Sequence, residues 1–243
     1  TWMVEELMGR GIERFFIVSD KRAHDMMRPY VPENADVVYV DGARHGEELL
    51  TLLKDEKGSV LIVNGAVLPV GVFSGGAVYS ADAKECCKVL KEHGAFAAFP
   101  KGAEITKGFL PVGDDEELRS AQDMCRRKIA DKHFAAGVSI MDVNNTYIDP
   151  RVKIGSGTVI LPGTILRGRT VIGKNCIIGP NAMIRDCTVG DETEVNASQL
   201  NESTVGAHTT VGPFAYVRPN SKIGDHVKVG DFGEIKNLSL IHI

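Results

Sequence analysis

The segment 171–184, VIGKNCIIGPNAMI, places an aliphatic residue at every sixth position, at Ile172, Ile178 and Ile184. The same spacing extends over about 148–235, with one-residue slips on reaching Val189, between Val195 and Leu200, and on reaching Val205. Neither the 3.6-residue period of an α-helix nor the two-residue alternation of a strand produces this spacing. The sequence therefore predicts a left-handed parallel β-helix of hexapeptide repeats, in preference to a β-sandwich with regular turns.

Each hexapeptide is expected to form one flat side of a triangular coil, with its aliphatic residue stacked on the counterpart in the next coil. Glycine often follows the aliphatic residue, as at Gly155 and Gly173, where we expect a corner with unusual dihedral angles. We expect the slips to be tightened corners. Small residues four places after the aliphatic ones should let the sides close, and these are Thr158, Thr164, Thr170, Cys176, Ala182, Thr188, Thr193, Thr204, Thr209, Ala215 and Ser221.

Residues 1–112 read as alternating helices and strands. Apolar runs at 15–18, 37–40, 60–63 and 78–79 predict strands, and 4–8 and 47–53 predict helices. Asp20 is a candidate helix N-cap. Continuous apolar strands between helices predict an α/β domain with a mostly parallel sheet covered on both faces.

Residues 113–137 predict a linker helix between the two parts. The segment begins with the acidic run 114–117 and is basic over 126–132, which suits the helix macrodipole. Gly137 is a candidate C-cap. A helix packed wholly within the first domain is the alternative.

The composition limits the partners. A formal net charge of −4 over 243 residues provides no basic field to recruit nucleic acid. No apolar run is long enough to span a bilayer, and residues 1–6 show no secretory signal. Five scattered cysteines without metal-ligand spacing indicate free thiols in a reducing cytoplasm. We therefore expect a cytoplasmic protein with neither nucleic-acid nor membrane partners.

Four motifs carry a family resemblance: NNTYID at 144–149, VIGKNCIIGPN at 171–181, VGPFAYVRP at 211–219 and VGDFGEIKN at 229–237. With the order of parts, they resemble the bifunctional GlmU family, specifically over about 113–237 and weakly before it. The resemblance implies a degenerate nucleotidyltransferase-like α/β domain over 1–112, a linker helix over 113–137 and an acyltransferase-like β-helix over 138–237. The tail 238–243 does not resemble the family.

The family transfers acetyl from acetyl-CoA to glucosamine 1-phosphate and uridyl from UTP, with Mg²⁺, to N-acetylglucosamine 1-phosphate. The resemblance thus implies a role in UDP-N-acetylglucosamine and cell-wall precursor synthesis, and a homotrimer assembled through the β-helix. Arg218 and Lys236 match residues that bind the sugar phosphate or nucleotide-sugar product. They lie eighteen residues apart, or three hexapeptides, so they should share one side of the coil. Two such cations can clamp a phosphate, although each read alone is an ordinary surface cation.

The chain departs from the family at its catalytic motifs. The general base, a histidine about twelve residues after the matched lysine, is expected beyond Ile243, and His242 does not match it. The family's glycine-rich nucleotide loop has no counterpart, and the metal-binding aspartate of its G-D-V-P motif corresponds to Ala66. Near the second metal ligand, Asp114 and Asp115 read as helix caps. We therefore predict no catalytic residue, no metal site and no nucleotidyl transfer for this chain.

Two other functions stay open. One is a relative of the ADP-glucose type of sugar-1-phosphate nucleotidyltransferase, which the Pro213-Phe214 and Arg218-Pro219 pairs disfavour. The other is a non-catalytic trimeric binding or scaffold subunit. His208 and His226 are also eighteen residues apart and could stack on one face, but zinc is not expected because a third ligand in register is missing, and both are read as exposed histidines. Cys176 and Cys187 are read as core residues.

Overall fold

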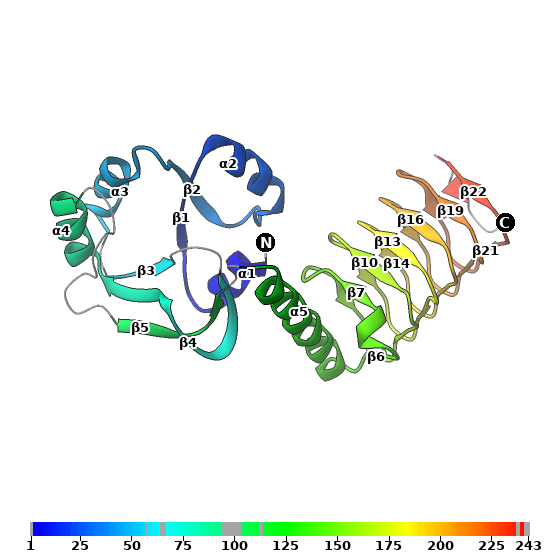
Figure 1. Cartoon of the computed structure of the whole chain (residues 1–243). Helices are drawn as coiled ribbons and strands as arrows, with labels where there is room; N and C mark the ends of the chain where they lie inside the picture. The colour runs from blue at the N-terminus through cyan, green and yellow to red at the C-terminus, as the bar shows by residue number, and fades with distance from the viewer. Residues whose placement is uncertain are drawn as a thin grey trace. The chain divides into compact units, whose positions relative to one another are not determined.

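The structure is a computed structural model that describes residues 2–56, 58–63, 67–93, 104–111, 114–236 and 239–240. The chain divides into two compact units, Thr1–Ala121 and Gln122–Ile243. Each unit is described by itself, and Figure 1 shows the elements of both.

The second unit consists of three parallel six-stranded sheets wound from one chain. The first sheet contains β7 (Tyr147–Ile148), β10 (Ile165–Arg167), β13 (Met183–Arg185), β16 (Gln199–Asn201), β19 (Tyr216–Val217) and β22 (Glu234–Ile235). The second contains β8 (Lys153–Ile154), β11 (Val171–Ile172), β14 (Thr188–Val189), β17 (Thr204–Val205), β20 (Lys222–Ile223) and β23 (Ser239–Leu240). The third contains β6 (Ser139–Ile140), β9 (Val159–Ile160), β12 (Ile177–Ile178), β15 (Glu194–Val195), β18 (Thr210–Val211) and β21 (Lys228–Val229). A 3₁₀ turn, η2 (Val143–Asn145), precedes β7.

Every described ladder of this unit pairs one aliphatic residue with the aliphatic residue of the next coil. In the first sheet Leu166, Ile184, Leu200, Val217 and Ile235 follow one another in register, and all are buried. Consecutive strands pass from sheet to sheet and all pairings are parallel, which a sandwich of antiparallel hairpins cannot produce. The predicted left-handed parallel β-helix is confirmed (Figure 1).

Most of the small residues that were predicted four places after the aliphatic ones also point inward, and their hydroxyl groups form a ladder of hydrogen bonds between coils. The Thr158 hydroxyl donates to the Gly173 carbonyl at 2.8 Å and accepts from the Cys176 amide at 3.0 Å. Thr193 repeats the pattern toward Gly206. Buried hydroxyls are tolerated here because each one finds partners in the adjacent coil.

Two of the predicted inward positions were wrong. Thr188 and Thr204 are exposed, and Cys187 and Ser203 occupy the buried positions. The reason is the one-residue slip, which removes a residue between the aliphatic and the small position. The left-handed corner residue then comes two places after the aliphatic one, as at Asp186 with a φ of 51°. The slips are therefore tightened corners, as expected.

Some of the glycines that follow the aliphatic residues have a different role from the predicted one, whereas Gly179 and Gly212 have the predicted unusual dihedral angles, with φ values of 105° and 98°. Gly155 and Gly173 are not the left-handed corner residues, which come two places later, for instance Gly157 and Asn175. A Cβ atom on Gly155 would lie 2.6 Å from the backbone carbon of Gly173 in the next coil. Glycine is needed at these positions because the stacked backbones approach too closely for a side chain.

Two matched substitutions test this close approach. Gly206→Ala should lower the free energy of unfolding by about 2 kcal/mol, because its Cβ would lie 2.4 Å from the Gly224 backbone. Gly230→Ala should change it by less than about 0.5 kcal/mol, because no atom lies within 4 Å of the added methyl group. Urea unfolding followed by circular dichroism measures both, and equal effects would contradict the explanation.

The helix α5 (Asp115–Ala135) ends against the first coil. Its N-terminus is capped by Asp114, whose carboxylate accepts the amides of Glu116 and Glu117 at 3.0 and 2.8 Å. Gly137 has a φ of 81° and ends the helix as predicted. Ala130 belongs to the hydrophobic core of the β-helix, so α5 is not packed wholly within the first unit. The boundaries at 112/113 and 137/138 stay predictions.

His133, on the same helix, is buried. Burial, and then repulsion from Lys132, lowers the pKa of His133 below its ordinary value of 6.5. Below pH 6.5 the unfolded chain therefore binds a proton that the folded chain refuses, so stability is lost as the pH falls.

We therefore expect the urea midpoint of the wild-type chain to fall between about pH 8 and about pH 5. His133→Leu should reduce that difference, because the buried titrating group is gone. His93→Leu removes an exposed histidine and should retain the wild-type difference. If the urea midpoint changed with pH by the same amount in the wild type and in both variants, His133 would have no such effect.

The first unit contains two small sheets. A parallel sheet pairs β1 (Arg14–Ser19) with β2 (Asp36–Asp41), and an antiparallel sheet pairs β3 (Ser59–Val63), β4 (Val67–Asp82) and β5 (Glu104–Pro111). The helical elements are α1 (Trp2–Gly9), α2 (Lys21–Met27), the 3₁₀ turn η1 (Arg28–Tyr30), α3 (His45–Leu53) and α4 (Ala83–His93).

The predicted α/β class of this unit is confirmed, but the predicted mostly parallel sheet is wrong. Among the described strands of the first unit, only β1 and β2 pair in parallel. Continuous apolar runs report burial of both strand faces and carry no information about strand direction. Asp20 caps α2 as predicted, accepting the Ala23 amide at 2.8 Å. None of the described helices combines the length and the apolar character that a bilayer-spanning segment requires.

Candidate functional site

Arg218 and Lys236 lie at equivalent positions of adjacent coils. They follow β19 and β22, which pair with Val217 opposite Ile235. The Arg218 amide donates to the Ile235 carbonyl at 2.9 Å, which continues the ladder past the strand ends. The expectation that both residues share one side of the coil is therefore confirmed. Their role in binding stays a prediction.

The Arg218 side chain is positioned by two neighbours on the same sheet. Its Nε lies 2.7 Å from Glu234 Oε1, an ion pair that lacks the alignment of a hydrogen bond. Its Cζ lies 5.4 Å from the centre of the Tyr216 ring. The ion pair is about half exposed and contributes at most about 1 kcal/mol. A guanidinium has five N–H donors, so engagement of Nε does not use up its capacity for an anion.

The structure extends this pair into a basic ladder that sequence reasoning missed. In the register of the first sheet, the residues that follow the aliphatic ones from β10 onward are Arg167, Arg185, Asn201, Arg218 and Lys236, whereas Asp149 takes this position after β7. Arg185 also forms an ion pair with a glutamate of the next coil, with its Nη2 3.0 Å from Glu202 Oε1. The sequence contained an indication of this ladder, because these residues recur at every third hexapeptide repeat. Glu234 and Tyr216 were also missed, since neither sequence separation nor residue type indicates their contact with Arg218.

The stacking predicted for His208 and His226 is confirmed. Their rings lie 4.7 Å apart at an interplanar angle of 4°, and His208 Nδ1 lies 3.3 Å from Glu192 Oε2. Both histidines are left-handed corner residues, which explains the column. Among the described residues, no group of three histidine, cysteine, aspartate or glutamate side chains is placed to hold a metal ion.

Cys176 and Cys187 are buried core residues, as predicted. Burial raises the pKa of both thiols, which further lowers their reactivity. The side chains at 65–68, aligned with the family's metal-binding motif, lie outside the described residues, as do Gly113 and His242. Asp115 is the first residue of α5 and Asp114 is its cap.

Comparison with known proteins gives the family relationship. A family profile described as the GMPPB C-terminal domain matches residues 142–241. The bifunctional protein GlmU of Clostridioides difficile (strain 630) is 42% identical over 153 residues, which cover 63% of this chain and 33% of that protein. The GlmU protein of Alkaliphilus oremlandii (strain OhILAs) is 49% identical over 128 residues, covering 53% and 28%.

The comparison with solved structures includes PerB from Caulobacter crescentus in complex with CoA and GDP-perosamine. It is 17% identical, covers 96% of this chain and 93% of that chain, and has a TM-score of 0.42. The β-helix assignment depends on the sheet topology of the second unit.

The matched part of the chain spans about a third of the length of these curated GlmU proteins. The resemblance seen in the four sequence motifs is confirmed by identities of 42–49% over more than half of this chain. This chain is therefore similar in sequence to the bifunctional GlmU proteins over more than half of its length.

Proposed function

We propose that the β-helix binds a sugar 1-phosphate through Arg218 and Lys236, in the acetyl transfer from acetyl-CoA to glucosamine 1-phosphate that the GlmU resemblance implies. The observation that carries the proposal is the register of β19 with β22, which brings the two cations of the matched motifs to equivalent positions. Adjacent strands of a sheet lie about 4.8 Å apart. Two cations one rung apart can therefore reach different oxygens of one phosphate.

The two cations contribute differently to such a clamp. The Arg218 guanidinium is held in place by Glu234 and Tyr216, so less side-chain entropy is lost when it binds an anion. Lys236 is exposed and presents a flexible ammonium group. Glu234 also places a carboxylate beside the clamp, which suits the amino group of glucosamine 1-phosphate.

The chemistry assigned to this chain is binding and orientation. In acetyl transfer the sugar amine attacks the thioester carbonyl, its proton passes to a base and the CoA thiolate leaves. We assign the base to no residue of this chain, and we propose no nucleotidyl transfer, since position 66 carries no carboxylate.

The binding proposal predicts separate effects for three variants. Arg218→Gln and Lys236→Gln should each weaken binding of glucosamine 1-phosphate by about tenfold to a hundredfold, because each removes a charged hydrogen-bond donor. Isothermal titration calorimetry of the full chain measures the affinity. Raised salt should weaken wild-type binding as well.

Arg185→Gln is the matched control. It removes a guanidinium from the same sheet, with a similar exposure and a similar ion pair to a glutamate. It should leave the affinity within about twofold, since Asn201 separates it from Arg218 in the ladder. An equal loss of affinity in all three variants would indicate nonspecific attraction to the basic ladder as a whole and would contradict the clamp.

We also propose that the chain assembles as a homotrimer through its β-helix. Phe214 and Phe232 stack at 5.3 Å on one corner of the coil and are 59% and 79% exposed. Exposed apolar ladders of this kind are favoured at subunit interfaces.

Light scattering should give a mass of three times 26.3 kDa. The double substitution Phe214→Ser and Phe232→Ser should lower that mass, because the apolar contact between subunits is lost. Replacing two serines that the coil already exposes elsewhere, such as Ser156 and Ser139, by alanine should not change it. A wild-type mass of 26.3 kDa at all concentrations would contradict the assembly.

A further inference from the structure

The strands β1 and β3 of the first unit lie in one layer. Phe15 of β1 and Leu61 of β3 pack in the same cluster as Leu7 of α1. The next residues along each strand, Phe16 and Ile62, pack in the other cluster, which α3 and α4 supply. Successive side chains of a strand point to opposite faces. Both strands therefore present one face to α1 and the other to α3 and α4.

No ladder joins these two strands within the described part of the chain. β1 pairs with β2, and β3 pairs with β4. Each strand therefore has one edge whose alternate amides and carbonyls have no strand partner among the described residues. Unpaired edges of this kind are templates for another strand.

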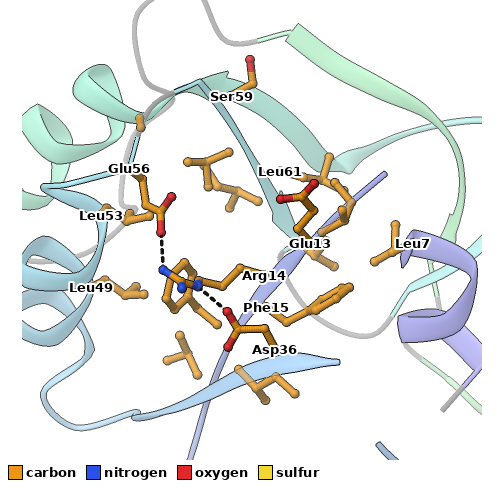
Figure 2. A pocket seen from close by; sticks show the side chains of 18 of the residues that line it. Leu7, Glu13, Arg14, Phe15, Asp36, Leu49, Leu53, Glu56, Ser59 and Leu61 are labelled. Atoms are coloured by element: carbon orange, nitrogen blue, oxygen red, sulfur yellow. Dashed lines mark hydrogen bonds and ion pairs between the residues drawn. The ribbon is translucent and has the colours of Figure 1, made fainter. Parts of the chain in front are cut away.

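A cavity of about 990 Å³ lies along both edges, within the first unit. Residues 14–18 of β1 and all residues of β3 line it, together with leucines from the helices on both faces. Figure 2 shows Leu49 and Leu53 on one side of the cavity, and Leu7 and Phe15 on the other. The walls are thus apolar on both faces of the layer, while backbone groups line the cavity along its strands.

The cavity also contains a charged cluster. Arg14 Nε lies 2.6 Å from Asp36 Oδ2, and Arg14 Nη1 lies 2.7 Å from Glu56 Oε1 (Figure 2). Glu13 lines the same cavity. Three carboxylates against one guanidinium leave a negative charge at this place, which favours a cation.

We propose that this cavity binds an extended apolar peptide segment with a basic end, which adds as a strand between β1 and β3. Only an extended backbone offers donors and acceptors to two edges at once, and its alternating side chains would fill the two apolar walls. A strand inserted between β1 and β3 needs two free edges. A second copy of this chain fits less well, because every described strand of its first unit already uses one edge to pair with a neighbour. The proposal concerns the first unit and is independent of sugar-phosphate binding by the second.

The test uses the full chain and a capped peptide of about six residues, alternating valine and leucine with arginine at one end. We expect saturable binding by fluorescence anisotropy, and slower hydrogen exchange of the amides in both β1 and β3. Amides of the β-helix should be unaffected. Protection of one strand alone, or of neither, would overturn the proposal.

Two N-methylated peptides with the same side chains are the controls. Successive residues of a strand direct their backbone groups to opposite edges, so methylating alternate residues blocks one edge and methylating the others blocks the second edge. Each peptide should bind about tenfold more weakly or worse, because several backbone hydrogen bonds are lost. Unchanged affinity would identify a merely apolar cavity, and a loss with only one peptide would identify addition to a single edge.

The charged cluster has its own matched pair of variants. Glu56→Gln should reduce the preference for the arginine-ended peptide over a glutamate-ended one by severalfold. Glu47→Gln, which alters an exposed residue of α3, should retain that preference. If the mass of the chain rises with concentration, and the peptide abolishes that self-association, the cavity would be assigned to a second copy and the proposal overturned.

Discussion

The parallel stacking of one inward aliphatic residue on the next is the interaction on which the second unit depends. The column that runs through Leu166, Ile184, Leu200, Val217 and Ile235 is buried along its whole length, and the other two sheets contain equivalent columns. Because each coil contacts only its neighbours, a shift of register in one coil would expose its aliphatic residue and displace the next. The hydroxyl ladder of Thr158 and its counterparts fixes the same register through buried hydrogen bonds.

The register of the core also determines the surface. Once Val217 lies opposite Ile235, the residues that follow them are neighbours, so Arg218 and Lys236 need no contact of their own to be brought together. The same constraint aligns the histidine pair and the phenylalanine pair on two different corners. A surface site on such a scaffold is therefore a consequence of core packing, and its spacing is set by the backbone rather than by side-chain interactions.

The first unit has a different balance of forces. Its strands are covered by α1 on one face and by α3 and α4 on the other, yet the layer is divided between two small sheets. Apolar burial above and below the layer holds the two parts in place, while the hydrogen bonds of the facing edges lack strand partners among the described residues. Arg14 joins the two sides through Asp36 and Glu56, exposed ion pairs that add little stability compared with a ladder.

The sequence by itself determined the β-helix, because a six-residue period has one simple structural solution, and it determined that Arg218 and Lys236 share a side, because eighteen residues make one full coil. It also indicated the caps of α5 at Asp114 and Gly137. Only the tertiary structure decided that Cys187 rather than Thr188 is buried, and that Gly155 and Gly173 serve close approach between coils. Those facts depend on where a coil loses a residue and on distances between segments far apart in the chain. The direction of strand pairing in the first unit and the contact of Glu234 with Arg218 were likewise decided by tertiary structure, since local periodicity reports which faces are buried and not which neighbours cover them.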